Sequence, residues 1–508
     1  MDFDFSFKSD PYEPNFRRKS GLSFNLTDVA GKFGYADVGE IFNQWLAALA
    51  HAGQTLWHIP TLHRSTNPHR LTISHGLAFD EALISLANLQ SLGLLTEAES
   101  TEAEEKIANT KNIDEITTLR KKYLDLVSAK FDDRASKNLL AELMSFEKTN
   151  ESWLNNYALF YALKHIFAGK PWWQWPEKIK DFDRKAIEAT RKQLSLQIRS
   201  AGILQFLLHK QLESAKNEAK KFGITLITDF KIYVEQDSPD VWTNQNLFFL
   251  DQTGQCTTVA GIPSSMLYPN GLKLGAPTYR WNRHRESNYH WFIQRLKKEL
   301  QIFDYVILEN FHELLESWEI PIAEANPNHG RWVPSGGGSL FEKIKNSFES
   351  PLPIIASETY SDFKSKRIIN RFNFANLHVL QYAFDEKFAH KLPKNYDETC
   401  LTIISASREN SLISWLNEYS HSSKLPKIMR KEFQECFGSN INESTWKAID
   451  KLLNSNADAV ILPLYDLLHI STKDTKTYIN INPTGFLNKL KQKLGEATIA
   501  AHRASFPN

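Results

Sequence analysis

Four stretches decide the fold of this chain: KIYVEQDSPDVW (231–242), VAGIPSSMLY (259–268), NGLKLGAPTYRW (270–281) and FDYVILENFHE (303–313). The last of them contains an apolar run that ends in polar residues. That run is DYVILEN (304–310), and similar runs occur before and after it: ITLITDF (224–230), PIIASE (353–358), HVLQYAF (378–384) and CLTIISAS (400–407). Short, continuous apolar runs of this kind predict parallel strands buried on both faces, with loops at their carboxyl ends.

A different periodicity fills residues 87–222. Apolar residues recur at three- and four-residue intervals in 116–131, 153–167 and 187–222, and charged residues cover the other faces. This pattern predicts a helical block that interrupts the strand-containing parts of the chain.

The four stretches resemble the amylomaltases, the 4-α-glucanotransferases of the α-amylase clan. The family pattern runs PIYVA, DSADVW, VAGVPPDYFS, GQxWGNPxYxW and FDxxRIDHFRG, in the order found here. The resemblance implies an α/β fold, a (β/α)8 TIM barrel with a large helical insertion. We therefore expect residues 1–86 to form the first part of the barrel, 87–222 the helical insertion subdomain, and 223–508 the remainder with inserted loops.

Composition excludes several classes of partner. The formal net charge is +1 over 508 residues, so electrostatics predict neither nucleic acid nor an anionic membrane. No apolar run reaches the length of a membrane span, and MDFDFSFKSD (1–10) lacks the apolar core of a signal peptide. Three distant cysteines favour a reducing compartment, and the histidines show no metal-binding spacing. We expect a cytoplasmic protein with no metal and no cofactor.

The resemblance implies a retaining reaction with three acidic side chains: a nucleophilic Asp, a Glu that protonates the leaving oxygen, and a second Asp that holds the distorted sugar. The nucleophile aligns with Glu309, a carboxylate with one more methylene. The arginine two residues earlier becomes Ile307, and the following histidine becomes Asn310. Loss of that arginine removes a cation that would help keep the nucleophile ionised.

The acid strand departs further from the family pattern. IIAEDLG aligns with IIASETY (354–360), so the acid falls on Ser357, whose hydroxyl is far too weak an acid to protonate a leaving group. Glu358 is one place along, and a one-residue shift on a strand points a side chain to the other face. Glu358 is therefore a candidate acid only if the strand end bends.

The third motif carries the wrong charge. YTGTHDNDT aligns with residues 393–415 and places Arg408 on the stabilising Asp. The transition state is oxocarbenium-like, and a guanidinium a few ångströms away would repel it by about 4 kcal/mol at an effective dielectric of about 20. That repulsion corresponds to roughly a thousandfold in rate. Arg408 is a surface or loop arginine instead if the local loop has moved.

Several sugar-contact positions are also replaced. The tyrosine of PPDYFS becomes Met266, and the tryptophan and asparagine of GQxWGNP become Leu274 and Ala276. Trp242 and Trp281 are retained, and either could be a stacking platform or part of the core. The candidate substrate-binding residues are Asp240, Trp242, Trp281, Asn310 and His69, the last of which replaces the tyrosine of an early SPYQ motif.

Three functions follow from this pattern. The first is a catalytically degenerate amylomaltase with weak recognition of α-glucans or maltooligosaccharides. The second is an active 4-α-glucanotransferase with Glu309 as nucleophile and Glu358 as displaced acid. The third is a protein-interaction module that uses the barrel scaffold for an unknown partner, since fold alone does not determine function.

Overall fold

The computed structural model describes most of the chain from residue 16 onward. It does not describe residues 1–15, 68, 111, 266, 350, 358–362, 386–390, 408–409, 420–424, 426, 439, 471–484, 486–493, 499–500, 502 and 504–508. The predicted positions Glu358, Arg408 and Met266 therefore lie outside the described residues.

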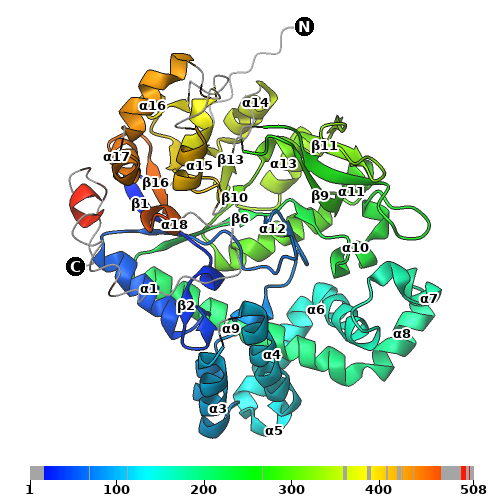
Figure 1. Cartoon of the computed structure of the whole chain (residues 1–508). Helices are drawn as coiled ribbons and strands as arrows, with labels where there is room; N and C mark the ends of the chain where they lie inside the picture. Colours follow the sequence, from blue (N-terminus) through cyan, green and yellow to red (C-terminus); the bar gives the residue numbers. More distant parts are fainter. Residues whose placement is uncertain are drawn as a thin grey trace.

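Eight parallel strands close into a barrel, and each lies between its neighbours in chain order (Figure 1). This arrangement confirms the (β/α)8 prediction. Apolar side chains from these strands fill the interior, among them Leu56, Ile227, Ile307 and Ile355. The strands are β1 (Lys19–Ser23), β4 (Leu56–His58), β6 (Thr225–Phe230), β10 (Tyr305–Leu308), β13 (Ile354–Ser357), β14 (Ala375–Val379), β15 (Cys400–Ile403) and β16 (Ala459–Pro463).

One predicted strand is wrong in its extent. The strand expected over 378–384 is β14, which ends at Val379, and Leu380–Phe384 form a 3-10 helix. The buried Gln381 explains the turn, because its amide donates to the carbonyl of Asn410 and accepts from the backbone N–H of Ala406. An apolar sequence that satisfies a strand pattern is held here as a turn by one side-chain amide.

The helical insertion lies between β4 and β6, on one side of the barrel (Figure 1). The predicted helical runs correspond to helices, and the two longest, α6 and α9, pack against one another. α9 also contacts β6 and α12, which joins the insertion to the barrel. The boundaries at 86 and 222 remain a prediction. The helices are α2 (Leu86–Ser91), α3 (Glu97–Ala108), α4 (Ile113–Ala129), α5 (Phe131–Arg134), α6 (Lys137–Ile166), α7 (Glu177–Lys180), α8 (Arg184–Gln193) and α9 (Ser195–Lys221).

The remaining helices cover the barrel or follow its strands. They are α1 (Glu40–His51), α10 (Pro239–Thr243), α11 (Trp281–Glu286), α12 (His290–Ile302), α13 (Gly337–Lys345), α14 (Phe363–Phe372), α15 (Leu412–Tyr419), α16 (Arg430–Phe437), α17 (Ile441–Leu453) and α18 (Leu464–Leu467). Among the described helices, none is both long and apolar enough to cross a membrane.

A small antiparallel sheet lies at the carboxyl end of the barrel. Its order is β12, β11, β8 and β9, and all four strands belong to connections that leave the carboxyl ends of β6 and β10. Those ends are where barrel enzymes place their functional residues. The strands are β8 (Thr258–Ile262), β9 (Leu272–Pro277), β11 (Glu316–Pro321) and β12 (Arg331–Pro334).

Candidate active site

A polar layer closes the barrel interior at the carboxyl ends of the strands. Side chains alternate along a strand, so a residue two places beyond an inward-facing apolar residue also faces inward. Five residues of the layer each stand two places beyond an interior apolar residue: His58 beyond Leu56, Asp229 beyond Ile227, Glu309 beyond Ile307, Ser357 beyond Ile355 and Ser405 beyond Ile403. A sixth follows Gly21, which pairs with Leu56. We call this set the mouth layer: Ser23, His58, Asp229, Glu309, Ser357 and Ser405.

The register of β10 and β13 brings the aligned nucleophile and acid positions side by side. Leu308 pairs with Ala356, so the next residues, Glu309 and Ser357, leave adjacent strands at the same level. Neighbouring strands lie about 4.8 Å apart, and the two carboxyl groups of a retaining site lie roughly 5–5.5 Å apart. The backbone therefore suits a nucleophile and acid pair, but position 357 carries a hydroxyl, on a residue that is 9% exposed.

An ammonium occupies the other side of Glu309. Lys231 directly follows Phe230, the last residue of β6, which pairs with Leu308 of β10. The Nζ of Lys231 lies 2.5 Å from Glu309 Oε2 and 3.2 Å from an oxygen of Asp229. The lysine side chain is only 5% exposed, whereas the Glu309 side chain is 26% exposed. Lys231 thus joins two carboxylates from adjacent strands, and Glu309 still reaches the mouth.

The network continues through a histidine to the first strand. His58 Nε2 lies 2.9 Å from Asp229 Oδ1, and His58 Nδ1 lies 2.9 Å from the hydroxyl of Ser23. All three side chains are buried. Buried charges are tolerated when they are paired and hydrogen-bonded. Asp229, His58 and Ser23 each have a hydrogen-bond partner within this network.

Burial and charge oppose each other in this cluster. Burial alone would lower the pKa of Lys231, but Glu309 and Asp229 outweigh it and raise that pKa above its ordinary value. Burial disfavours ionised Asp229, yet Lys231 and His58 together hold its pKa below its ordinary value. For Glu309, burial outweighs Lys231 and raises the pKa of the carboxyl. Lys231 therefore stays charged, and Glu309 takes up a proton more readily than Asp229.

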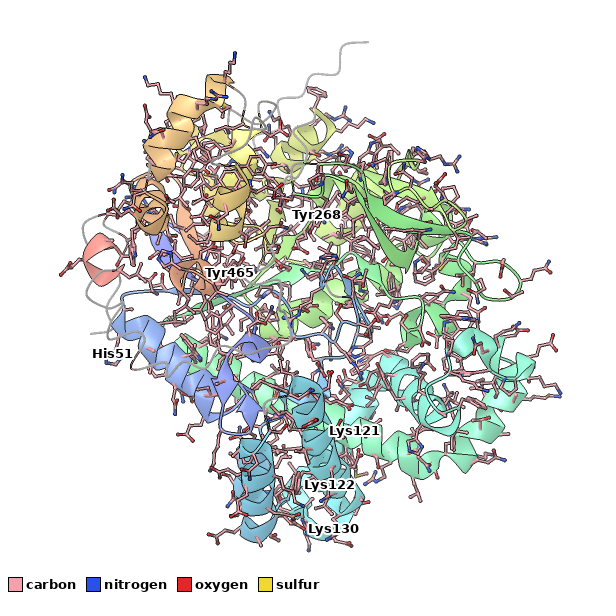
Figure 2. All side chains as sticks on the ribbon, in the orientation of Figure 1. His51, Lys121, Lys122, Lys130, Tyr268 and Tyr465 are labelled. Atoms are coloured by element: carbon pink, nitrogen blue, oxygen red, sulfur yellow. The ribbon has the colours of Figure 1, made fainter. Side chains whose placement is uncertain are left out.

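A separate buried carboxyl, that of Asp466 in α18, lies beside the residues that follow β15. Ser405 donates to Asp466 Oδ2 at 2.5 Å, and the backbone N–H of Leu412 donates to Asp466 Oδ1 at 2.7 Å. Burial raises the pKa of Asp466 to about 7. Its neighbour Tyr465 is labelled in Figure 2, over the barrel part of the molecule, and its hydroxyl oxygen lies 3.3 Å from that of Ser405. These contacts bind α15 to α18 and make Asp466 a structural group.

Two predicted substrate-binding residues, Asn310 and His69, keep part of their surface exposed. Asn310 follows Glu309 directly and has a left-handed backbone, with φ 50°, which asparagine adopts more readily than most residues. The ring of His69 meets that of Tyr268 edge-on, with centroids 6.2 Å apart. Both residues are partly exposed, so a role in binding stays a prediction for them.

The other three substrate-binding candidates are buried. Trp242 is 0% exposed, and its indole N–H donates to the carbonyl of Ile179 in the insertion. Asp240 accepts from the backbone of Gly76 and from the indole of Trp291. Trp281 is 7% exposed and packs on Tyr279 and His284. Of the two roles left open for the tryptophans, these positions favour the core, because both side chains belong to a cluster of buried apolar residues.

Replacing Trp242 with alanine is expected to destabilise the protein by about 3–5 kcal/mol, because a fully buried aromatic side chain leaves a cavity. Chemical denaturation measures the loss. As a control, the affinity of the folded variant for maltoheptaose should match that of the unaltered protein. A selective loss of affinity in a stably folded variant would return Trp242 to the binding surface.

Sequence reasoning missed Lys231 and His58. The signal for Lys231 was visible, since a lysine stands directly after a buried strand, at the place of the proline in the family pattern PIYVA. His58 also ends a buried strand. A charged or polar residue at the carboxyl end of a barrel strand is a candidate site residue on that ground alone. Among the described residues, no group of three or more potential ligands could hold a metal ion.

Comparison with known proteins agrees with this geometry. The 4-alpha-glucanotransferase family model matches residues 25–485. The 4-alpha-glucanotransferase of Synechocystis sp. is 28% identical over 463 residues, 90% of each chain, and that of Thermus thermophilus is 27% identical over 474 residues, 91% of this chain and 92% of its own. Amylomaltase from Streptococcus agalactiae, solved in complex with acarbose, has a similar fold, with a TM-score of 0.85 and 24% identity over 96% of this chain and all of its own. The chain therefore belongs to the 4-α-glucanotransferase family.

Proposed function

We propose that this protein is a member of the family that has lost the disproportionation of α-1,4-glucans and keeps weak recognition of maltooligosaccharides. The observation that carries the proposal is the hydroxyl of Ser357 beside Glu309, at the end of β13. Cleavage of a glucan expels a sugar alkoxide, which needs a proton as it leaves. A positioned acid typically contributes about 10²–10⁴-fold to such a step.

The binding surface supports weak recognition. Leu274 and Ala276, which replace a tryptophan and an asparagine of the family pattern, are buried in β9 and present neither a ring nor an amide to a sugar. A lost hydrogen bond typically costs about 0.5–1.5 kcal/mol. Several lost contacts together correspond to roughly two to four orders of magnitude in affinity. The ligand class rests on the family and on the acarbose bound by the streptococcal amylomaltase.

The purified protein is expected to produce no glucose and no longer maltooligosaccharides from maltotriose, because no acid protonates the leaving oxygen. Chromatography of the products measures this, with a family enzyme run in parallel. Titration calorimetry with maltoheptaose is expected to give a dissociation constant in the millimolar range. Clean disproportionation that disappears in Glu309→Gln would contradict the proposal.

The second candidate function is an active 4-α-glucanotransferase. The observation in its favour is the retained carboxylate of Glu309, in register with the acid position and partly exposed at the mouth. In that case Glu358 supplies the proton, and Glu358→Gln removes disproportionation as fully as Glu309→Gln does. The interaction module stays a prediction, and its partner is not specified by the site.

A further inference from the structure

We infer that the carboxyl-terminal segment is a strap that locks the seam of the barrel, and that release of the strap opens this seam while the other strands stay paired. The seam is the contact between the first and the last barrel strands, β1 and β16. The strap is the described part of the carboxyl-terminal segment: residues 494–498, Ala501 and Arg503. It lies beyond residue 485, where the match to the family ends.

The seam differs from the other contacts between barrel strands. Each of those contacts joins strands that follow one another along the chain, whereas the seam joins the two ends of the chain. Its pairs run from Lys19 with Ala459 to Ser23 with Pro463. The entropy cost of closing a loop grows with the length of the loop, so the seam is the costliest contact of the barrel to close. Folded proteins open locally where the structure is least stable, and we therefore expect the seam to need a lock.

Arg503 supplies a contact that crosses the seam. The residue is 2% exposed, and its guanidinium donates five hydrogen bonds to backbone carbonyls. One goes to Lys19 in β1 at 3.3 Å, and another goes to Asp458, directly before β16, at 3.2 Å. The planar fork of a guanidinium can bond several acceptors at once, so one side chain ties both strands together. The other three acceptors lie in the turn between α17 and β16: Leu453, Ser455 and Ala457.

A second arginine ties the strap to the residue before β1. The guanidinium of Arg18 donates to the carbonyl of Ser455 at 2.7 Å and to that of Ala501, in the strap, at 2.5 Å. The backbone of Arg18 is left-handed, with φ 55°, a conformation that persists in a residue with a side chain only where its surroundings hold it. In Figure 1 the strap is the red helix next to β1 and α17. The strap, the start of β1 and the turn before β16 therefore share one network of hydrogen bonds.

The charges of this network oppose one another. Both guanidiniums donate to the same turn, and the carboxyl group of Asp458 faces both of them. Burial and the neighbouring Arg18 lower the pKa of Arg503 to about 10, because a second cation disfavours the charged form. The carbonyls at the end of α17 attract cations, but the repulsion between the arginines works against the strap. The hydrogen bonds of Arg503 therefore hold the strap, and their loss favours its release.

Hydrogen exchange of the whole chain, followed by mass spectrometry, tests the strap. In Arg503→Met we expect exchange in β1, β16 and the strap to be about tenfold to a hundredfold faster, the change that one lost hydrogen bond to a charged group typically produces. Exchange in β6 and β10 should stay the same. Arg503→Lys should resemble Arg503→Met, because an ammonium keeps the charge but lacks the planar fork. Arg371→Met is the control, since that side chain is 55% exposed in its pair with Glu342, and it should leave the seam unchanged.

Exchange of the unaltered protein in low concentrations of denaturant needs no variant to fold. The amides of β1, β16 and the strap should exchange through one shared opening, at a lower free energy than the amides of β6 and β10. Exchange of the seam only together with β6 and β10 would overturn the inference. An Arg503→Met variant in which all strands exchange equally faster, or none does, would overturn it as well. These readouts do not depend on maltooligosaccharides, so failure of the strap is distinguishable from failure of the proposed function.

Discussion

Ser357→Glu is expected to raise the rate of maltotriose disproportionation by about 10²–10⁴-fold over the unaltered protein, the range that a positioned acid typically contributes. The substitution places a carboxyl beside Glu309, at the level where the two strands are in register. The mouth there is largely buried, and burial favours the protonated form of a carboxyl, which is the form that donates. Product chromatography over a pH series measures the gain.

Ser357→Gln is the matched control, because it adds the same bulk and a polar head without an acidic proton. It should show no gain. Adding Arg408→Asp to Ser357→Glu is expected to contribute roughly another thousandfold if the repulsion of about 4 kcal/mol applies. A stably folded Ser357→Glu variant that still gives no product, alone or with Arg408→Asp, would show that more than the proton donor and the stabilising charge has been lost.

Lys231→Met is expected to destabilise the protein by about 3–5 kcal/mol at neutral pH, because it leaves the buried Asp229 and the largely buried Glu309 without their shared cation. Chemical denaturation measures the change. Lys364→Met is the control, since the Lys364 side chain is 62% exposed in its pair with Glu316. Exposed pairs contribute about 0–1 kcal/mol. Equal losses in the two variants would mean that the buried cluster is not stabilised by its lysine.

The loss of stability caused by Lys231→Met is expected to depend on pH and to be smaller in acid. In the unaltered protein the lowered pKa of Asp229 contributes stability that is present above its unfolded pKa of about 3.9 and is lost as pH falls through the folded pKa. The raised pKa of Lys231 contributes stability that is lost only as pH rises through its folded pKa. Removing the cation raises the pKa of both carboxyls. The deficit of Lys231→Met should therefore shrink as pH falls from 8 to about 5.

The amino-acid sequence by itself determined the fold class and its landmarks. Apolar runs that end in polar residues predicted the strands around Ile227, Ile307, Ile355 and Ile403, because a strand buried on both faces must be apolar along its length. The positions of Glu309 and Ser357 at the ends of two of these strands were also readable from the sequence. The prediction of a strand over 378–384 was wrong beyond Val379, because an apolar pattern does not show that the chain turns at the buried amide of Gln381.

Only the tertiary structure decided which charges meet. Lys231 lies 78 residues from Glu309, and its proximity depends on the pairing of β6 with β10, which no local pattern specifies. Likewise His58 reaches Asp229 across 171 residues because β4 and β6 are neighbours. Trp242 is a core residue for the same reason: helix α7 of the insertion folds over it. Sequence determines which groups a strand carries to the mouth, and the closure of the barrel determines their partners.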